Sequence, residues 1–173
     1  MIIVGYQGIG KSTLTRADHS DAFIDLESSN FWFKDDDGKN IRWPNWYDIY
    51  CNLAEDLSSQ GYIVFVSSHK AVRERLKRST VGVCAIAPAS YLKDEWIEKL
   101  EDRYNSSNSE KDYKALMNAK ECYESNVTDI LNDCKGGVII DDIHYDLEKS
   151  IHHFMNVTMD NGGEISGYIP SLC

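Results

Sequence analysis

Long apolar runs, a basic leader and paired cysteines are all missing from this 173-residue sequence. Its longest apolar runs, such as residues 62–66, are far shorter than the ~20 residues that a membrane-spanning helix needs. No basic segment followed by a long apolar one opens the sequence, so we expect no secretory signal. The five cysteines form no Cys-x-x-Cys pair, which argues against a zinc site and a disulfide framework. We therefore expect a cytoplasmic protein with reduced thiols and no membrane contact.

Basic residues are scarce relative to acidic ones. The 18 Lys and Arg against 28 Asp and Glu give a net charge of −10. Duplex nucleic acid requires a positive field, so it is an improbable partner, although a local basic patch can still bind a single phosphate. The length and the 42% hydrophobic content fit one globular domain over residues 1–173.

Short apolar segments alternate with segments of helical period along the chain. The expected strands are residues 2–4, 22–24, 62–66, 81–87 and 138–140, and the expected helices are 11–17, 46–59, 70–78, 90–104, 111–134 and 145–155. This alternation predicts an α/β fold, a five-stranded parallel sheet flanked by helices. Residues 156–173 have no clear period and are expected to form an irregular tail.

The most specific motif lies near the N-terminus. Residues 5–12 fit G-x-x-x-x-G-K-[ST], in which glycines let successive N–H groups face a phosphate. Lys11 would contact the β- and γ-phosphates, and the Ser12 hydroxyl would bind Mg²⁺. The residues expected to hold ATP are Gly5, Tyr6, Gln7, Gly8, Ile9, Gly10, Lys11, Ser12 and Thr13. A GTPase would also need an Asn-Lys-x-Asp motif, which the sequence does not contain.

With this motif, two further segments give the chain a family resemblance. Residues 23–27 place an acidic pair after the second strand, and residues 64–77 join a strand, a Ser-Ser-His turn and a basic helix. On these three features the chain resembles the shikimate kinase, gluconate kinase and adenylate kinase branch of P-loop phosphotransferases. The resemblance implies a nucleotide-kinase-like P-loop fold, ATP and Mg²⁺ as cofactors, and a small acceptor. Adenylate-kinase-like enzymes often carry an acid after the third strand, where this chain has Ser67-Ser68-His69, so metal positioning rests on Ser12 and Asp25.

The acidic pair has two expected roles. Asp25 and Glu27 alternate on a strand end, so their side chains face opposite sides. We assign Asp25 to the catalytic base or the metal contact, and Glu27 to an acceptor hydroxyl. The alternative is a pair of solvated strand-end acids that begin a turn.

A short lid is expected over residues 103–114. Arg103 would close over the transferring phosphate and neutralise developing charge, with the polar loop 105–109, Lys111 and Lys114 beside it. Alternatively, Arg103 only stabilises the C-terminus of its own helix.

Two further segments are candidates for acceptor binding. His69 and Arg73 belong to the most basic stretch of the chain and would capture an anion, unless this stretch is a solvated helix face. Residues 31–50 hold seven of the 19 aromatic residues and include a predicted hairpin that turns at Asp37-Gly38. Trp32 in this insertion could stack on a base, or the aromatics could simply pack a small subdomain.

Three functions remain open from the sequence. The first is an ATP- and Mg²⁺-dependent kinase with a small acceptor, a nucleoside or nucleotide. The second is a kinase acting on a nucleic-acid end or base, and the third is a non-catalytic ATP-binding sensor. The oligomeric state is open.

Overall fold

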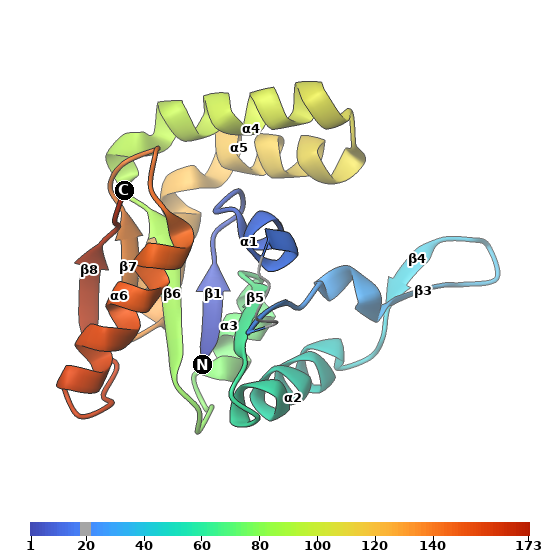
Figure 1. Ribbon diagram of the computed structural model, residues 1–173. Coiled ribbons are helices and arrows are strands. Elements are labelled where there is room, and N and C mark those ends of the chain that lie inside the picture. Colours follow the sequence, from blue (N-terminus) through green and yellow to red (C-terminus); the bar gives the residue numbers. More distant parts are fainter. Residues whose placement is uncertain (18–21) are drawn as a thin grey trace.

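The computed structural model of the chain describes residues 1–17 and 22–173. Its elements form an α/β architecture with one six-stranded parallel sheet and a separate two-stranded hairpin (Figure 1). The strands of the sheet are β1 (Ile2–Gly5), β2 (Phe23–Asp25), β5 (Ile63–Ser67), β6 (Val83–Pro88), β7 (Gly136–Ile140) and β8 (Gly167–Pro170). The helices are α1 (Lys11–Ala17), α2 (Trp46–Ser59), α3 (Lys70–Leu76), α4 (Lys93–Ser107), α5 (Glu110–Asp133) and α6 (Leu147–Asp160), with 3-10 turns at Ser28–Phe31 and Ser90–Leu92.

The spatial order of the strands is β2-β5-β1-β6-β7-β8, and every neighbouring pair is parallel. In Figure 1, α1 and α6 lie in front of the sheet and α3 and α5 lie behind it. The central strands are therefore covered on both faces, which explains why their sequences are continuous apolar runs. Ile2, Ile3, Val64 and Phe65 are fully buried. The expected α/β class and the five expected strands are confirmed.

The expected irregular tail is wrong, because residues 156–173 contain the end of α6 and the sixth strand, β8. A Cβ atom on Gly136 would come within 2.2 Å of the Gly167 carbonyl oxygen, so this close strand pairing requires glycine. Tyr168 anchors the strand by donating from its hydroxyl to the Leu131 carbonyl across 2.7 Å. The sheet consequently has six strands rather than five.

The expected loop at residues 105–109 is also largely helical, since α4 continues to Ser107 and α5 begins at Glu110. Asn108 makes the turn in the left-handed conformation, with φ of 48°, and the Ser109 hydroxyl caps α5 by accepting from the Asp112 amide. Residues 103–114 therefore form the tip of a helical hairpin, which lies above the carboxyl ends of the strands in Figure 1.

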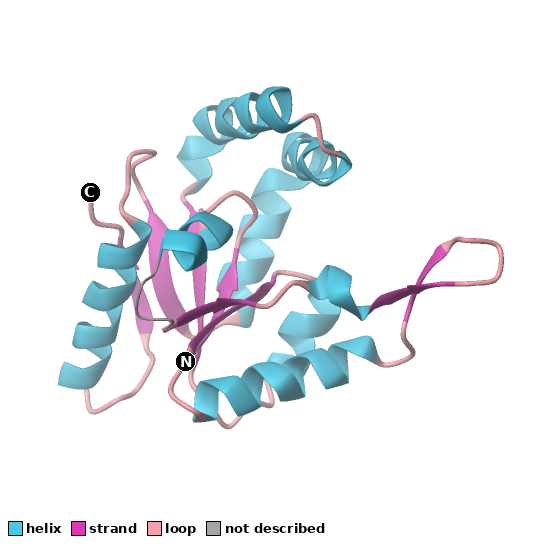
Figure 2. Cartoon of the chain, turned by 45° about the vertical axis from the view of Figure 1, so that its right-hand side comes forward, coloured by secondary structure: helices cyan, strands magenta, loops and turns pink. Residues whose placement is uncertain are grey.

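The aromatic insertion contains the predicted hairpin, formed by β3 (Trp32–Lys34) and β4 (Asn40–Arg42). Figure 2 shows that it projects from the body of the molecule and is joined to it through α2 and the turn at Ser28–Phe31. Of the five cysteines, all free, Cys51 and Cys84 are buried. None of the helices described is long and apolar enough to cross a membrane.

Candidate functional site

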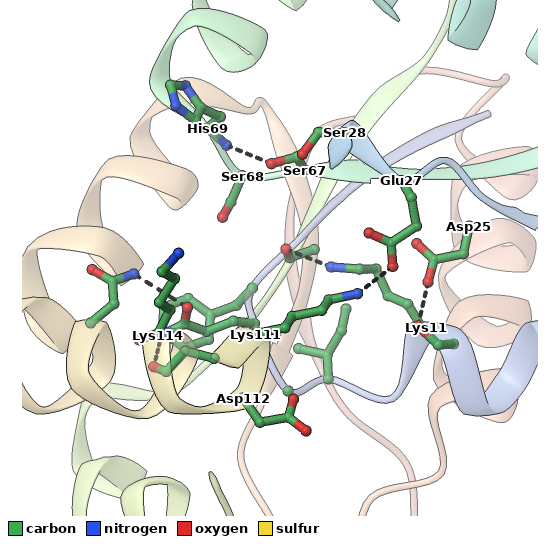
Figure 3. Close-up of a pocket in the computed structure, with 18 of the residues that line it drawn as sticks. Lys11, Asp25, Glu27, Ser28, Ser67, Ser68, His69, Lys111, Asp112 and Lys114 are labelled. Carbon is green, nitrogen blue, oxygen red and sulfur yellow. Dashed lines mark hydrogen bonds and ion pairs between the residues drawn. The ribbon is translucent and has the colours of Figure 1, made fainter. Parts of the chain in front are cut away.

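A cleft of about 1290 Å³ opens where β1, β2 and β5 end (Figure 3). From β1 the chain continues to β2, at one edge of the sheet, whereas from β6 it continues toward the opposite edge, to β7. The direction of the strand connections therefore reverses within the sheet. Ligands of open α/β sheets bind beside such a reversal, outside the carboxyl ends of the strands. All nine residues expected to hold ATP line this cleft.

The loop between β1 and α1 is fixed by its glycines. Gly8 and Gly10 have φ of 84° and 88°, which residues with a Cβ rarely adopt. The Gly10 carbonyl accepts from the Thr13 and Leu14 amides at 3.0 and 2.9 Å. A Cβ on Gly5 would lie 2.6 Å from Ile9 Cδ1, so a side chain there would have to displace the Ile9 side chain. The loop is thus a tight turn whose backbone faces the cleft.

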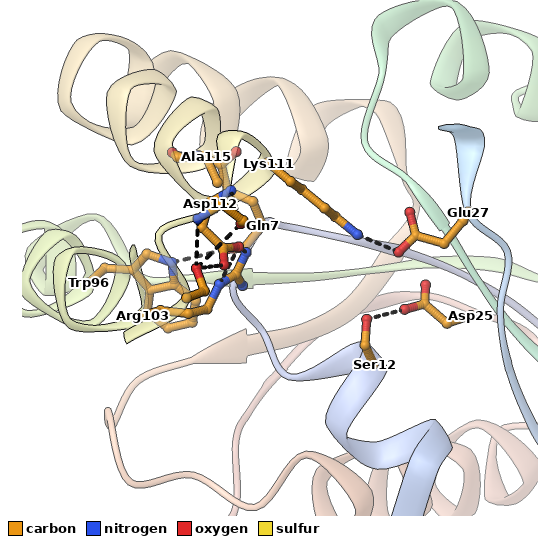
Figure 4. A network of polar contacts seen from close by, with 11 residues as sticks. Gln7, Ser12, Asp25, Glu27, Trp96, Arg103, Lys111, Asp112 and Ala115 are labelled. Carbon is orange, nitrogen blue, oxygen red and sulfur yellow. Dashed lines mark hydrogen bonds and ion pairs between the residues drawn. The ribbon is translucent and has the colours of Figure 1, made fainter. Parts of the chain in front are cut away.

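The helical hairpin holds this loop through Gln7, a contact that the sequence did not predict (Figure 4). The buried indole of Trp96 in α4 donates to the Gln7 carbonyl at 3.0 Å. The Gln7 side chain donates to the Ala115 carbonyl in α5 at 2.8 Å and accepts from Asn118 at 3.2 Å. The loop and the hairpin therefore form one connected unit.

Lys11 lies over the loop and donates from Nζ to the Gly5 carbonyl at 3.2 Å. Burial lowers the pKa of Lys11, and the negative charges of Asp25 and Glu27 act against this effect. The cations Lys111 and Arg103 act in the same direction as burial. Lys111 and Arg103, both on the α4–α5 hairpin, are therefore close enough to act electrostatically on Lys11.

Ser12 and Asp25 meet directly at the mouth of the loop. The Ser12 hydroxyl donates to Asp25 Oδ2 across 2.6 Å. A hydroxyl and a carboxylate are the hard oxygen ligands that Mg²⁺ uses, together with waters and ligand phosphates. No cluster of three or more His, Cys, Asp or Glu suited to a metal occurs within residues 1–17 and 22–173. The Ser12–Asp25 pair would supply two oxygen ligands to a metal whose other ligands are waters and phosphate oxygens.

Two ion pairs involve cations of the α4–α5 hairpin, and one of them, Lys111–Glu27, joins the hairpin to the segment after β2. Lys111 reaches from α5 to Glu27 Oε1 at 2.5 Å (Figure 3). Arg103 donates from Nε to Asp112 at 2.7 Å, and the Ser107 hydroxyl donates to the same carboxylate. Burial alone would raise the pKa of Asp112, but these hydrogen bonds lower it. Arg103 and Glu27 both line the cleft, and both are paired in this structure.

Tyr50 joins the two strand ends that carry these groups, and the sequence analysis did not single it out. Its buried hydroxyl donates to the Leu26 carbonyl at 2.6 Å and accepts from the Ser67 amide at 2.8 Å. Leu26 lies between Asp25 and Glu27, so this hydrogen bond fixes the acidic pair relative to β5. In the sequence, the one indication of this role is that Tyr50 is a tyrosine on the apolar face of α2.

The three remaining predicted residues have different surroundings. His69 lines the cleft and its ring packs edge-on against Trp46 at 5.4 Å. Arg73 also borders the cleft, but its side chain is only 6% exposed and pairs with Asp129 and Asp133 at 3.2 and 2.7 Å. Trp32 is 40% exposed on the hairpin and lines a separate hollow of about 410 Å³.

The cleft is lined by more basic than acidic residues, although the whole chain is acidic. Among the described residues, eight of the chain's 18 Lys and Arg line it, against four of the 28 Asp and Glu. The cations are Lys11, Arg16, Arg42, Lys70, Arg73, Arg103, Lys111 and Lys114. A locally positive cleft in a protein of net charge −10 concentrates anionic ligands.

In comparisons with known proteins, no family model matches the chain and no curated protein is significantly similar to it.

Proposed function

We propose that the protein is an ATP- and Mg²⁺-dependent phosphotransferase with a nucleotide-kinase-like P-loop fold that moves the γ-phosphate of ATP to a small acceptor. The observation that carries this proposal is the joint position of Lys11 and the Ser12–Asp25 pair at one end of a cation-lined cleft. A lysine whose pKa is lowered by burial, beside a hydroxyl–carboxylate pair, suits a nucleoside triphosphate with its metal.

The residues of the cleft divide into three tasks. Backbone amides of residues 5–12 would hold the β-phosphate, with Lys11 moving from the Gly5 carbonyl to the phosphates. Ser12 and Asp25 would hold magnesium, which when bound neutralises charge on the phosphate oxygens. The direct Ser12–Asp25 hydrogen bond favours this metal role for Asp25 over that of a free base.

The helical hairpin would supply the lid. Arg103 and Lys111 lie at its tip, and both belong to ion pairs that a bound triphosphate would exchange for phosphate oxygens. Closure would exclude water, which directs the γ-phosphate to the acceptor instead of to hydrolysis. Because Gln7 connects the loop to α4 and α5, triphosphate binding and lid position are mechanically linked.

The proposal is tested with ATP labelled on the γ-phosphate, Mg²⁺ and a panel of nucleosides, nucleotides and oligonucleotides. We expect label on a small acceptor at a rate well above ATP hydrolysis without acceptor. Label on oligonucleotide ends alone would favour a nucleic-acid kinase. Tight ATP binding without transfer to any acceptor would favour a sensor, and absence of ATP binding would contradict the proposal.

A further inference from the structure

Trp96, a fully buried residue of α4, donates a hydrogen bond to the backbone of the glycine-rich loop. Its indole Nε1 lies 3.0 Å from the Gln7 carbonyl oxygen, as the close-up in Figure 4 shows. The peptide bond that joins Gln7 to Gly8 is planar and trans, so its carbonyl and its N–H point in opposite directions. The Gly8 N–H therefore points away from the indole.

The Gly8 amide is available to a ligand. Gly8 lines the cleft and is only partly buried, whereas the indole of Trp96 has no exposed surface. Within residues 1–17 and 22–173, no carbonyl oxygen or side chain accepts a hydrogen bond from the Gly8 N–H. A backbone donor that has no partner in the fold needs water or a ligand oxygen.

The backbone of the loop permits two orientations of this peptide. Gln7 and Gly8 form a turn, and the φ of 84° at Gly8 is that of the third residue of a type II turn. In a type I turn the central peptide is rotated, and the third residue has a φ of about −90°. Glycine adopts both signs of φ readily. A contact from outside the turn is therefore needed to select one orientation, and the hydrogen bond from Trp96 is such a contact.

The indole that makes this contact is itself held on several sides. Tyr145 stacks on it, with ring centres 6.1 Å apart and an angle of 15° between the rings, and Tyr6 packs edge-on at 6.2 Å. The Lys99 ammonium lies 4.5 Å from the ring centre of Trp96 and 4.8 Å from that of Tyr145. Lys99 forms no ion pair with a described residue, so these rings are its main partners. A cation beside the indole also polarises its N–H and strengthens it as a donor.

Building on the proposed function, we propose that Trp96 is a positioning residue for the triphosphate, because its indole N–H holds the Gln7–Gly8 peptide with the Gly8 N–H directed at a phosphate oxygen. Trp96 does not touch the ligand. If the peptide rotated, the Gln7 carbonyl oxygen would turn toward the cleft and repel the phosphates. The hydrogen bond from α4 thus replaces a repulsive group by a charge-assisted donor.

The experiment removes the indole donor in two ways. Trp96→Phe loses the N–H together with part of the ring. In a second protein, β-(3-benzothienyl)alanine replaces Trp96 alone, which keeps the shape of the indole and exchanges its N–H for sulfur. Leu100→Val is the matched control, because Leu100 is also buried and lies against Gly8. A Cβ on Gly8 would come within 2.9 Å of Leu100 Cδ2 and 3.2 Å of Trp96 Nε1.

Two measurements report on the loop. NMR of the free, ¹⁵N-labelled proteins gives the orientation of the peptide, since a type II turn brings the Gln7 Hα close to the Gly8 amide proton and a type I turn brings the two amide protons together. Calorimetric titration with inorganic tripolyphosphate and with Mg·ATP gives the affinity for the phosphates, with and without a base. Thermal unfolding identifies any variant that is not folded at the temperature of titration.

We expect a strong contact between Gln7 Hα and the Gly8 amide proton in the native chain and in Leu100→Val. Both proteins without the indole N–H should show contact between the two amide protons instead. They should bind tripolyphosphate and Mg·ATP roughly tenfold more weakly, as for a weakened hydrogen bond to a charged oxygen. Leu100→Val should lose stability but keep both affinities within about twofold of the native values.

Native affinity for tripolyphosphate in the benzothienylalanine protein would overturn this inference and leave the proposed function intact. An unchanged peptide orientation in that protein would also overturn it, as would an equal loss of affinity in Leu100→Val. If the native chain binds Mg·ATP in a Trp96-dependent manner but transfers phosphate to no acceptor, the proposed function fails while the role of Trp96 stands. Absence of binding of both ligands to the native chain would contradict both proposals.

Discussion

The hydroxyl of Ser12 and the carboxylate of Asp25 are joined by a 2.6 Å hydrogen bond, although the two residues lie on different elements. Ser12 follows the loop lysine at the start of α1, and Asp25 is the last residue of β2. This contact joins the acidic segment of residues 23–27 to the glycine-rich loop of residues 5–12, two motifs that the sequence analysis identified. Under the proposed function, these two oxygens are the ones that would hold magnesium.

Replacing Asp25 by Asn should lower the rate of phosphoryl transfer much more than it lowers the affinity for Mg·ATP. The amide keeps the shape of the side chain but loses its charge, so Mg·ATP affinity should stay within a few fold while transfer falls roughly 100-fold or more. Glu27→Gln is the comparison, and should act on acceptor KM instead. Steady-state kinetics with ATP and acceptor varied separately measure both. Normal turnover by Asp25→Asn would remove this residue from the site.

Replacing Arg103 by Ala should lower kcat more than it weakens ATP binding. The guanidinium is expected to leave Asp112 and contact the phosphate that is transferred, so its contribution should arise mainly in the transition state. We expect a loss of roughly tenfold or more in kcat. Lys120→Ala is a matched control, since it breaks another α4–α5 ion pair, with Glu101 at 3.0 Å, outside the cleft. An equal effect of both variants would make Arg103 a residue of hairpin stability alone.

Tyr50→Phe should affect both stability and transfer. Loss of the hydroxyl leaves the Leu26 carbonyl and the Ser67 amide without their partner, at a cost of about 1–3 kcal/mol. Tyr123→Phe loses a buried hydrogen bond to the Ala89 carbonyl and should cost a similar amount of stability. Only Tyr50→Phe should also lower kcat, because only Tyr50 fixes the acidic pair. Denaturant unfolding and kinetics on both variants test this difference.

Arg73 is expected to stabilise the fold through its ion pair with Asp133. Burial raises the pKa of Asp133, but hydrogen bonds from Lys77 and Arg73 outweigh it, so the pKa lies below its usual 3.8. A lowered carboxyl pKa stabilises the fold above the unfolded value, and the contribution disappears as pH falls through the lowered value. Asp133→Asn should therefore cost roughly 3 kcal/mol at pH 7.

The difference between Asp133→Asn and the native chain should then shrink as the pH falls below 3.8. Unfolding free energies measured across this range test the prediction. Asp129→Asn is the control, because Asp129 is 58% exposed and should contribute less. A stability difference that does not change with pH would contradict the role given to this ion pair.

The sequence predicted the parts of the structure that depend on local pattern. Buried parallel strands are continuous apolar runs, so β1 and β5 were recognisable, and the Asp37-Gly38 turn marked the hairpin. The loop of residues 5–12 was recognisable because its glycines and Lys11 occur at fixed spacing. β8 was missed because only Tyr168 and Ile169 are apolar between Gly167 and Pro170, a pattern typical of an edge strand.

Contacts between distant segments could not be predicted in this way. Gln7 meets Trp96 and Ala115 only after α4 and α5 fold over the loop. Arg73 was assigned to a ligand because its own segment is basic, and nothing local indicates that Asp129 and Asp133, one helical turn apart on α5, face it.

The central claim, that residues 5–12 bind the phosphates of Mg·ATP, is tested most directly by calorimetric titration of Mg·ATP into the native chain and Lys11→Ala. The lysine faces the cleft rather than the core, so the variant should fold normally, as circular dichroism can verify. We expect saturable binding by the native chain, and a loss of roughly two orders of magnitude in affinity or in subsequent transfer when a charge contact of ~3 kcal/mol is removed. Equal Mg·ATP affinity and turnover in the two proteins would contradict the claim.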